Sequence, residues 1–266
     1  MLQCQNLYKT FHPDNNPLND KKALQGVNLT IHDGDFVAVI GGNGSGKTTL
    51  LNCIAGVHRP DKGSMILDGI NLRDYKEHQR AKWIGRVFQD PMQGTIADIS
   101  LFENLALAAK RGEKPSPFRW ALSKKKKADF LALLKPLGLG LEDRLDAKIG
   151  SFSGGQRQSV TLLMATLAKP KLLLLDEHTA ALDPKTARTV MELTQKIVTE
   201  NHIPTLMITH NMKDAIKYGN RLIMMNAGKI IFEASGQEKQ KLTVEDLVGK
   251  FAKAGDEDLP DAMILG

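Results

Sequence analysis

The residues most clearly suited to binding a ligand form a glycine-rich segment at positions 41–48. The segment reads Gly-Gly-Asn-Gly-Ser-Gly-Lys-Thr and fits the pattern G-x-x-x-x-G-K-[ST]. Glycines suit phosphate binding because backbone N–H groups must close around the phosphate oxygens, and a Cβ would block that approach. The Lys47 ammonium can reach the β- and γ-phosphates, while the Thr48 hydroxyl is a suitable Mg²⁺ ligand. We therefore expect a nucleoside triphosphate with magnesium to be held by Gly41, Asn43, Gly44, Ser45, Gly46, Lys47, Thr48 and Thr49.

A second group that could take part in binding or catalysis is an acidic pair, Asp176 and Glu177. This pair follows an apolar run at residues 172–175. The Asp176 carboxylate would lie at the end of a strand, where it can hold Mg²⁺ directly or through water. Glu177 can orient or deprotonate the attacking water, so we expect it to be the general base of hydrolysis. The alternative is that Glu177 only stabilises a turn.

Three short apolar runs must position these groups. Residues 36–40 precede the glycine-rich turn, residues 172–175 precede the acidic pair, and residues 205–209 precede His210. In an open parallel sheet the carboxyl ends of the strands form the ligand crevice. The runs therefore predict an α/β fold in which distant parts of the sequence build one shared site.

The remaining segments suggest how the chain is organised. Residues 91–150 have helical periodicity with few strand-like runs, which indicates a helical lobe inserted in the α/β core. Residues 12–22 are polar and turn-rich, as in a hairpin loop, and residues 243–246 are typical of a helix start. We expect one domain over 1–236, with a helical subdomain at about 91–160, followed by a helical extension and acidic tail over 237–266.

Bulk properties narrow the class of protein. A chain of 266 residues can hold one large α/β domain, and no apolar run approaches the roughly 18 residues needed to cross a bilayer. The first residues do not resemble a secretory signal, so we expect a cytoplasmic location. The two cysteines, Cys4 and Cys53, form no metal-binding or disulfide pattern and are expected to be inert thiols.

The net charge of +6 is concentrated locally rather than spread along the chain. A surface with this charge can bind nucleic acid or an anionic membrane, but such runs are more often a solvated helix face. The cluster consists of Lys110, Arg111, Lys114, Arg119 and Lys124 to Lys127.

The segment at residues 151–158, Ser-Phe-Ser-Gly-Gly-Gln-Arg-Gln, resembles the signature of ABC ATPases. Gln89 in Val-Phe-Gln-Asp, Asp183 in Ala-Leu-Asp and His210 in Ile-Thr-His match further motifs of that family in the family's order. The resemblance covers residues 2–233. It implies a P-loop NTPase (RecA-like) α/β core, an antiparallel β subdomain and an inserted helical subdomain, with ATP and Mg²⁺ as ligands.

The same resemblance implies roles for the matching residues. Two copies would stack head to tail, so that Ser153, Gly154, Gly155 and Gln156 of one copy grip the phosphates held by the other. Gln89 would contact magnesium and the attacking water, Asp183 would communicate across the dimer, and His210 would contact the γ-phosphate.

Phe11 resembles the aromatic residue that stacks on adenine, and Tyr8 is the competing candidate. The alternative is that the aromatic side chain only packs in the core. Two positions depart from the family pattern. Phe152 replaces a leucine and should preserve apolar packing, whereas His178 replaces a proline. A histidine there adds a titratable group near the metal, so we expect it to affect the rate or its pH dependence.

A cassette of this kind would power a transporter from the cytoplasmic face of the membrane, through separate transmembrane permease subunits. We expect import of amino acids or similar small solutes, with an extracellular solute-binding protein as a further partner. The alternatives are an exporter cassette, or a soluble ABC ATPase in iron–sulfur assembly or in work on nucleic acid. The basic cluster would suit nucleic acid, but the tandem cassettes or long insertions typical of that class are absent from the sequence.

Overall fold

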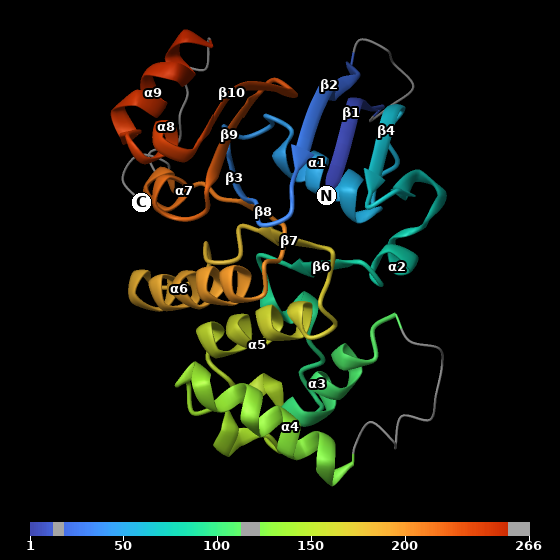
Figure 1. The fold of residues 1–266 in the computed structure, drawn as a ribbon, viewed down its shortest axis with the longest axis vertical. Helices are drawn as coiled ribbons and strands as arrows, with labels where there is room; N and C mark the ends of the chain where they lie inside the picture. Colours follow the sequence, from blue (N-terminus) through green and yellow to red (C-terminus); the bar gives the residue numbers. More distant parts are fainter. Residues whose placement is uncertain (13–18, 113–122, 255–266) are drawn as a thin grey trace.

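The structure is a computed structural model that describes residues 1–12, 19–112 and 123–254. Its strands form one four-stranded and one six-stranded sheet (Figure 1). The smaller sheet is antiparallel, in the order β2-β1-β4-β5. Its strands are β1 (Leu2–Phe11), β2 (Lys21–Ile31), β4 (Lys62–Leu67) and β5 (Ile70–Asn71).

The larger sheet has the order β10-β9-β3-β8-β7-β6. All neighbouring strands from β9 to β6 run parallel, and β10 is antiparallel to β9. Parallel strands are covered on both faces, which explains why three of them are short and almost continuously apolar. The strands are β3 (Phe36–Ile40), β6 (Ile84–Val87), β7 (Leu172–Asp176), β8 (Thr205–Ile208), β9 (Arg221–Asn226) and β10 (Lys229–Ser235).

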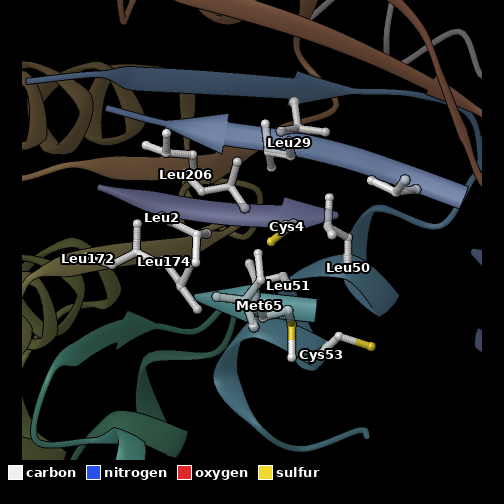
Figure 2. Packing of buried hydrophobic residues seen from close by; sticks show 14 of the residues in the cluster. Leu2, Cys4, Leu29, Leu50, Leu51, Cys53, Met65, Leu172, Leu174 and Leu206 are labelled. Atoms are coloured by element: carbon white, nitrogen blue, oxygen red, sulfur yellow. The ribbon is translucent and has the colours of Figure 1, made fainter. Parts of the chain in front are cut away.

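Helix α1 (Lys47–Ala55) lies between the two sheets. Figure 2 shows its side chains Leu50, Leu51 and Cys53 packed against residues of both sheets, including Leu2 of β1 and Leu174 of β7. Each of these side chains is almost completely buried. Because burial of apolar area is the main stabilising term in folding, this cluster fixes α1, and hence the glycine-rich loop before it, against the larger sheet.

The other face of the larger sheet is covered by helices (Figure 1). Side chains that alternate with those of the first cluster, such as Leu173 and Leu175, point to this side. Leu247 and Phe251 of α9 are fully buried in the same cluster. The helices that contribute are α5 (Gly154–Thr166), α6 (Pro184–Glu200), α7 (Met212–Lys217) and α9 (Val244–Lys253); α8 (Gly236–Gln240) precedes α9.

A helical lobe lies between β6 and β7 in sequence and forms a third cluster (Figure 1). It contains α3 (Leu101–Ala109), α4 (Lys124–Leu134) and one side of α5; α2 (Glu77–Arg80) precedes β6. Ser100 and Glu103 form a capping box that starts α3. Helices therefore occupy the segment in which the sequence predicts them, while the exact domain boundaries stay a prediction.

Several smaller expectations are resolved. Thr243 caps α9 in a capping box with Asp246, as its sequence predicts. Strands β1 and β2 pair antiparallel, and residues 13–18 of the loop between them lie outside the described residues. The acidic tail at 256–261 lies outside them as well, as do Lys114 and Arg119 of the basic cluster. Within the described ranges, no helix has both the length and the apolar character needed to span a membrane.

Candidate nucleotide-binding site

The glycine-rich loop joins β3 to α1 in a tight path. Gly46 adopts φ +103°, a conformation that side chains strongly disfavour, and a Cβ there would overlap the carbonyl oxygen of Ala23 on β2. A Cβ on Gly41 would overlap the carbonyl oxygen of Met225 on β9. The loop packs closely against β2 and β9, which requires glycine at both positions. The backbone amides of the loop continue directly into the N-terminus of α1.

Two buried polar groups sit in this loop. The Lys47 ammonium donates hydrogen bonds to the carbonyl oxygens of Gly41, at 2.7 Å, and Gly42, at 3.0 Å. The Ser45 Oγ is buried and has no hydrogen-bond partner among the described residues. An unpaired buried hydroxyl beside a helix N-terminus and a buried lysine suits an anionic ligand. Such a ligand can accept hydrogen bonds from the hydroxyl and the helix N–H groups, and its charge is opposite to that of the ammonium.

An open cleft connects the loop to the ends of two neighbouring strands. Glu177, which follows β7, and His210, which follows β8, lie in the same cleft as the loop. Parallel strands end at one edge of the sheet, which is why residues far apart in sequence meet here. The residues that line the cleft are Phe11, Lys21, Ala23, Asn43, Gly44, Ser45, Gly46, Lys47, Thr48, Thr49, Glu177 and His210.

Glu177 and His210 contact each other directly. The Glu177 Oε1 lies 2.5 Å from the His210 Nε2. Glu177 has φ +46°, in the left-handed region, and its N–H donates to the carbonyl oxygen of Ile208. A left-handed conformation in a residue other than glycine costs roughly 1–3 kcal/mol and persists only where its surroundings enforce it. The strain is therefore in the backbone of Glu177, the residue whose carboxylate faces the cleft.

Asp176 ends β7, one residue before Glu177. Its Oδ2 forms an ion pair with the Arg86 Nη2, at 3.2 Å. Burial raises the pKa of the Asp176 carboxyl, and the Arg86 guanidinium partly opposes that rise. Among the described residues, no group of three or more His, Cys, Asp or Glu side chains could hold a metal ion. A magnesium site built from one carboxylate, one hydroxyl and substrate phosphates needs no such group.

The other residues singled out from the sequence lie elsewhere. Gln89 is exposed and follows β6. The Ser153 side chain caps α5 in a capping box with Gln156, and Asp183 caps α6. None of these residues, nor Gly154 or Gly155, belongs to the described lining of the cleft.

Gly155 is constrained by packing rather than by its backbone angles. A Cβ at this position would overlap the Cγ2 of Thr186 on α6. Nearby, the buried Gln158 of α5 donates a hydrogen bond from Nε2 to the carbonyl oxygen of Phe88, at 3.1 Å. Helix α5 is thus tied closely both to α6 and to the segment that carries Gln89.

The structure distinguishes the two aromatic candidates. Phe11 lines the cleft, with its ring edge-on to His58 at a centroid distance of 5.1 Å. The Tyr8 ring instead lies against Gly26. Lys21 and Ala23 also line the cleft, although sequence reasoning missed them. The strand pairing in the structure brings Lys21 to the cleft as the cross-strand partner of Phe11, whereas the sequence placed it in a hairpin loop.

The two departures from the family pattern have different outcomes. Phe152 is buried, with the Arg144 guanidinium 4.2 Å from its ring centroid, and it fills an apolar position as expected. His178 is buried too, and its Nε2 lies 3.1 Å from the Thr194 Oγ1 on α6. Burial lowers the pKa of His178 to about 4. His178 does not belong to the described lining of the cleft, and its effect on the rate or on the pH dependence of hydrolysis stays a prediction.

Comparisons with known proteins agree with this geometry. The family described as ABC transporter matches residues 24–180, more than half of the chain. The tyrosine transport ATP-binding protein of Clostridioides difficile is 44% identical over 255 residues, covering 96% of this chain and 100% of the relative. The phosphonates import ATP-binding protein PhnC of Treponema denticola is 34% identical over 239 residues, covering 88% of this chain and 89% of the relative.

Solved structures show the same fold. The dimeric ATP-binding cassette MJ0796, in a post-hydrolysis state bound to ADP and Pi, has a TM-score of 0.73 and 30% identity to this chain. The match covers 88% of this chain and 98% of that cassette. The expected P-loop α/β core with an antiparallel β subdomain is thereby confirmed. The chain belongs to the ABC transporter family, as an ATP-binding and ATP-hydrolysing subunit.

Proposed function

We propose that this subunit powers the import of an amino acid or a similar small solute through a separate transmembrane permease. The observation that carries the proposal is the 44% identity, over the full length of the relative, to a tyrosine transport ATP-binding protein. Other relatives are named for the import of phosphonates, sulfate or thiosulfate, and xylose or arabinose. Names from several importers support a small solute, and the name of the tyrosine transport relative supports an amino acid.

We infer that the glycine-rich loop and Lys47 bind the triphosphate of ATP, with Phe11 against the adenine. The buried Ser45 hydroxyl and the N-terminus of α1 suit the anionic phosphates. Thr48, Asp176 and Gln89 would hold Mg²⁺, which supplies positive charge next to the phosphate oxygens.

In this proposal Glu177 is the general base. The 2.5 Å contact with His210 fixes one carboxylate oxygen, so that the other is left to accept a proton from the attacking water. A carboxylate can only accept in that contact, so the His210 Nε2 carries the proton that it donates. His210 would thereby orient the base and, from its place in the lining of the cleft, would contact the γ-phosphate.

We also propose that two copies of the subunit close head to tail on ATP. The signature residues 153–156 do not line the cleft of their own chain, and Ser153 and Gly154 are exposed. Backbone amides at the start of α5 suit a phosphate. A second copy would bring them to it, as the dimeric state of the similar cassette MJ0796 suggests. Loss of the γ-phosphate would then reopen the pair and move the permease at the cytoplasmic face of the membrane.

The proposed association with a transmembrane permease is tested with a tagged Glu177→Gln subunit. The subunit is extracted from its own cells in mild detergent with MgATP. Copurifying proteins are identified by mass spectrometry, with Lys47→Ala as the matched variant that lacks the phosphate contact. Recovery of a polypeptide with several membrane spans supports the transporter role, and a solute-binding protein in the same sample supports import. Ribosomes, nucleic acid or assembly factors without a membrane protein would overturn it.

The solute is tested by uptake. Cells with the unaltered subunit should accumulate labelled tyrosine or another amino acid faster than cells with Glu177→Gln, while uptake through unrelated systems stays equal. Faster export in the unaltered cells would instead show an exporter cassette.

A further inference from the structure

Arg86 lies in the middle of β6 and contacts three other parts of the site's framework. Its Nη2 donates to the Asn52 Oδ1 on α1, at 2.8 Å, and to the Asp176 Oδ2 at the end of β7, at 3.2 Å. The guanidinium carbon also lies 4.5 Å from the ring centroid of Phe88. One side chain therefore links the helix after the glycine-rich loop, the acidic strand and the segment that leads to Gln89.

These contacts adjoin each of the three residues proposed to hold magnesium. Asp176 is contacted directly. Asn52 is four residues after Thr48 in α1, so both lie on the same face of that helix. Phe88 immediately precedes Gln89. The Arg86 guanidinium thus contacts Asp176 itself and one neighbour of each of the other two residues.

The burial of Arg86 argues against a merely adventitious contact. The Arg86 and Asp176 side chains are 15% and 14% exposed. The Arg86 Nε is buried and has no acceptor among the described residues. Burying a charged group with an unsatisfied donor is unfavourable, so apolar packing alone does not account for an arginine at this position.

We propose that Arg86 is a positioning residue that holds Asp176 by its Oδ2 and leaves Oδ1 for the coordination shell of magnesium. The inference rests on the proposed role of Asp176 as a metal ligand. Arginine suits the task because its planar, permanently charged group can donate to two acceptors and stack on an aromatic ring at once. Arg86 makes both hydrogen bonds from Nη2, so the single nitrogen of a lysine could donate to the same two acceptors. Lysine lacks the planar face that lies over Phe88, so it should replace Arg86 only in part.

Arg80 provides a matched control. It is also a buried arginine beside α1, and its guanidinium donates to the backbone carbonyl oxygens of Cys53, Ile54 and Tyr75. It supports the end of α1 through backbone contacts and, among the residues that the structure describes, forms no hydrogen bond or ion pair with Asp176. Loss of Arg80 should therefore lower thermal stability without changing metal binding.

The experiment compares the full chain with Arg86→Met, Arg86→Lys, Arg80→Met and Asp176→Asn. Mn²⁺ affinity is measured by electron paramagnetic resonance in the presence of a non-hydrolysable ATP analogue, and affinity for a fluorescent ATP analogue is measured in EDTA. Arg86→Met should weaken Mn²⁺ binding about 10-fold, as loss of a residue that orients a metal ligand typically does. Arg86→Lys should lie between, and nucleotide affinity in EDTA should stay within about twofold for both.

Each outcome decides the inference. If Asp176→Asn weakens Mn²⁺ binding but Arg86→Met does not, Arg86 is not a positioning residue, and the proposed metal site stands. If Asp176→Asn has no effect, the metal site is wrong, and the inference about Arg86 fails with it. An equal loss in Arg80→Met would show a general structural effect. Should Arg86→Met fail to fold, Asn52→Ala removes the second anchor of the guanidinium and should shift Mn²⁺ affinity in the same direction.

Discussion

The Glu177 carboxylate and the His210 imidazole lie 2.5 Å apart, although 33 positions separate them in the sequence. Each follows a strand of the same parallel sheet, and Glu177 has a left-handed backbone conformation that turns it into the cleft. In the proposed function, this pair connects the fold to the hydrolysis of ATP.

Replacing Glu177 with glutamine should abolish most hydrolysis and leave ATP binding intact. The amide keeps the size of the side chain and can still meet His210, but it cannot take a proton from water. We expect kcat to fall by about 10²- to 10⁴-fold, the usual contribution of a general base. Phosphate release and equilibrium nucleotide binding are measured in parallel. A variant with normal turnover would remove Glu177 from the role of base.

Phe11 and Tyr8 should differ in their effect on nucleotide affinity. Phe11 lines the cleft, whereas the Tyr8 ring lies over Gly26. Phe11→Ala should weaken ATP binding by about 1–3 kcal/mol, the size of one base-stacking contact. Tyr8→Ala is the matched control and should bind ATP normally. Titration calorimetry measures both, and the reverse order of effects would assign the adenine contact to Tyr8.

His178 should make stability fall in mild acid. Burial lowers the pKa of this histidine to about 4, so the unfolded chain takes up a proton at a higher pH than the folded chain does. The free energy of unfolding is therefore highest at pH values above the ordinary histidine pKa. As the pH falls toward 4, this group should lower it by roughly 3 kcal/mol in total.

The check is urea unfolding at several pH values between 4 and 7. His178→Gln should have a shallower dependence on pH than the unaltered chain, while the exposed His78→Gln should keep the original dependence. Identical slopes for all three would show that another group controls acid stability.

Gly155 should tolerate no larger residue while Thr186 keeps its methyl group. A Cβ at Gly155 would overlap the Thr186 Cγ2, so Gly155→Ala should lose about 1–3 kcal/mol of stability, as overpacking typically does. Thr186→Ser removes that methyl group and should restore most of the loss. Gly154→Ala is the control, because its Cβ would meet only the Leu182 side chain at 3.3 Å. Thermal unfolding is measured for Gly155→Ala, Thr186→Ser, the double variant that carries both changes, and Gly154→Ala. If the double variant is no more stable than Gly155→Ala, the loss comes from a backbone effect.

The sequence predicts the elements of the site better than the contacts within it. Residues 36–40, 172–175 and 205–209 could be predicted as strands because these apolar runs end in residues with known chemistry, and the structure has strands at all three places. The meeting of Glu177 with His210 follows once those strands are parallel neighbours.

Other features depend on where side chains point, which neither motif nor periodicity encodes. His178 contacts Thr194 on α6 and is not part of the described cleft lining, although it directly follows Glu177 in the sequence. Arg86 reads as an unremarkable residue of a short strand, and only the pairing of β6 with β7 brings it to Asp176. Lys21 reaches the cleft through antiparallel pairing across a loop.

Helix α5 contributes buried side chains to two clusters at once. Leu162 and Ala165 pack with the larger sheet, while Val160, Leu163 and Met164 pack with the helical lobe. Unfolding the lobe by itself would therefore expose one side of a helix that the sheet still holds. We expect the lobe and the core to form one cooperative unit, whose amides in α5 and β7 lose protection from hydrogen exchange together.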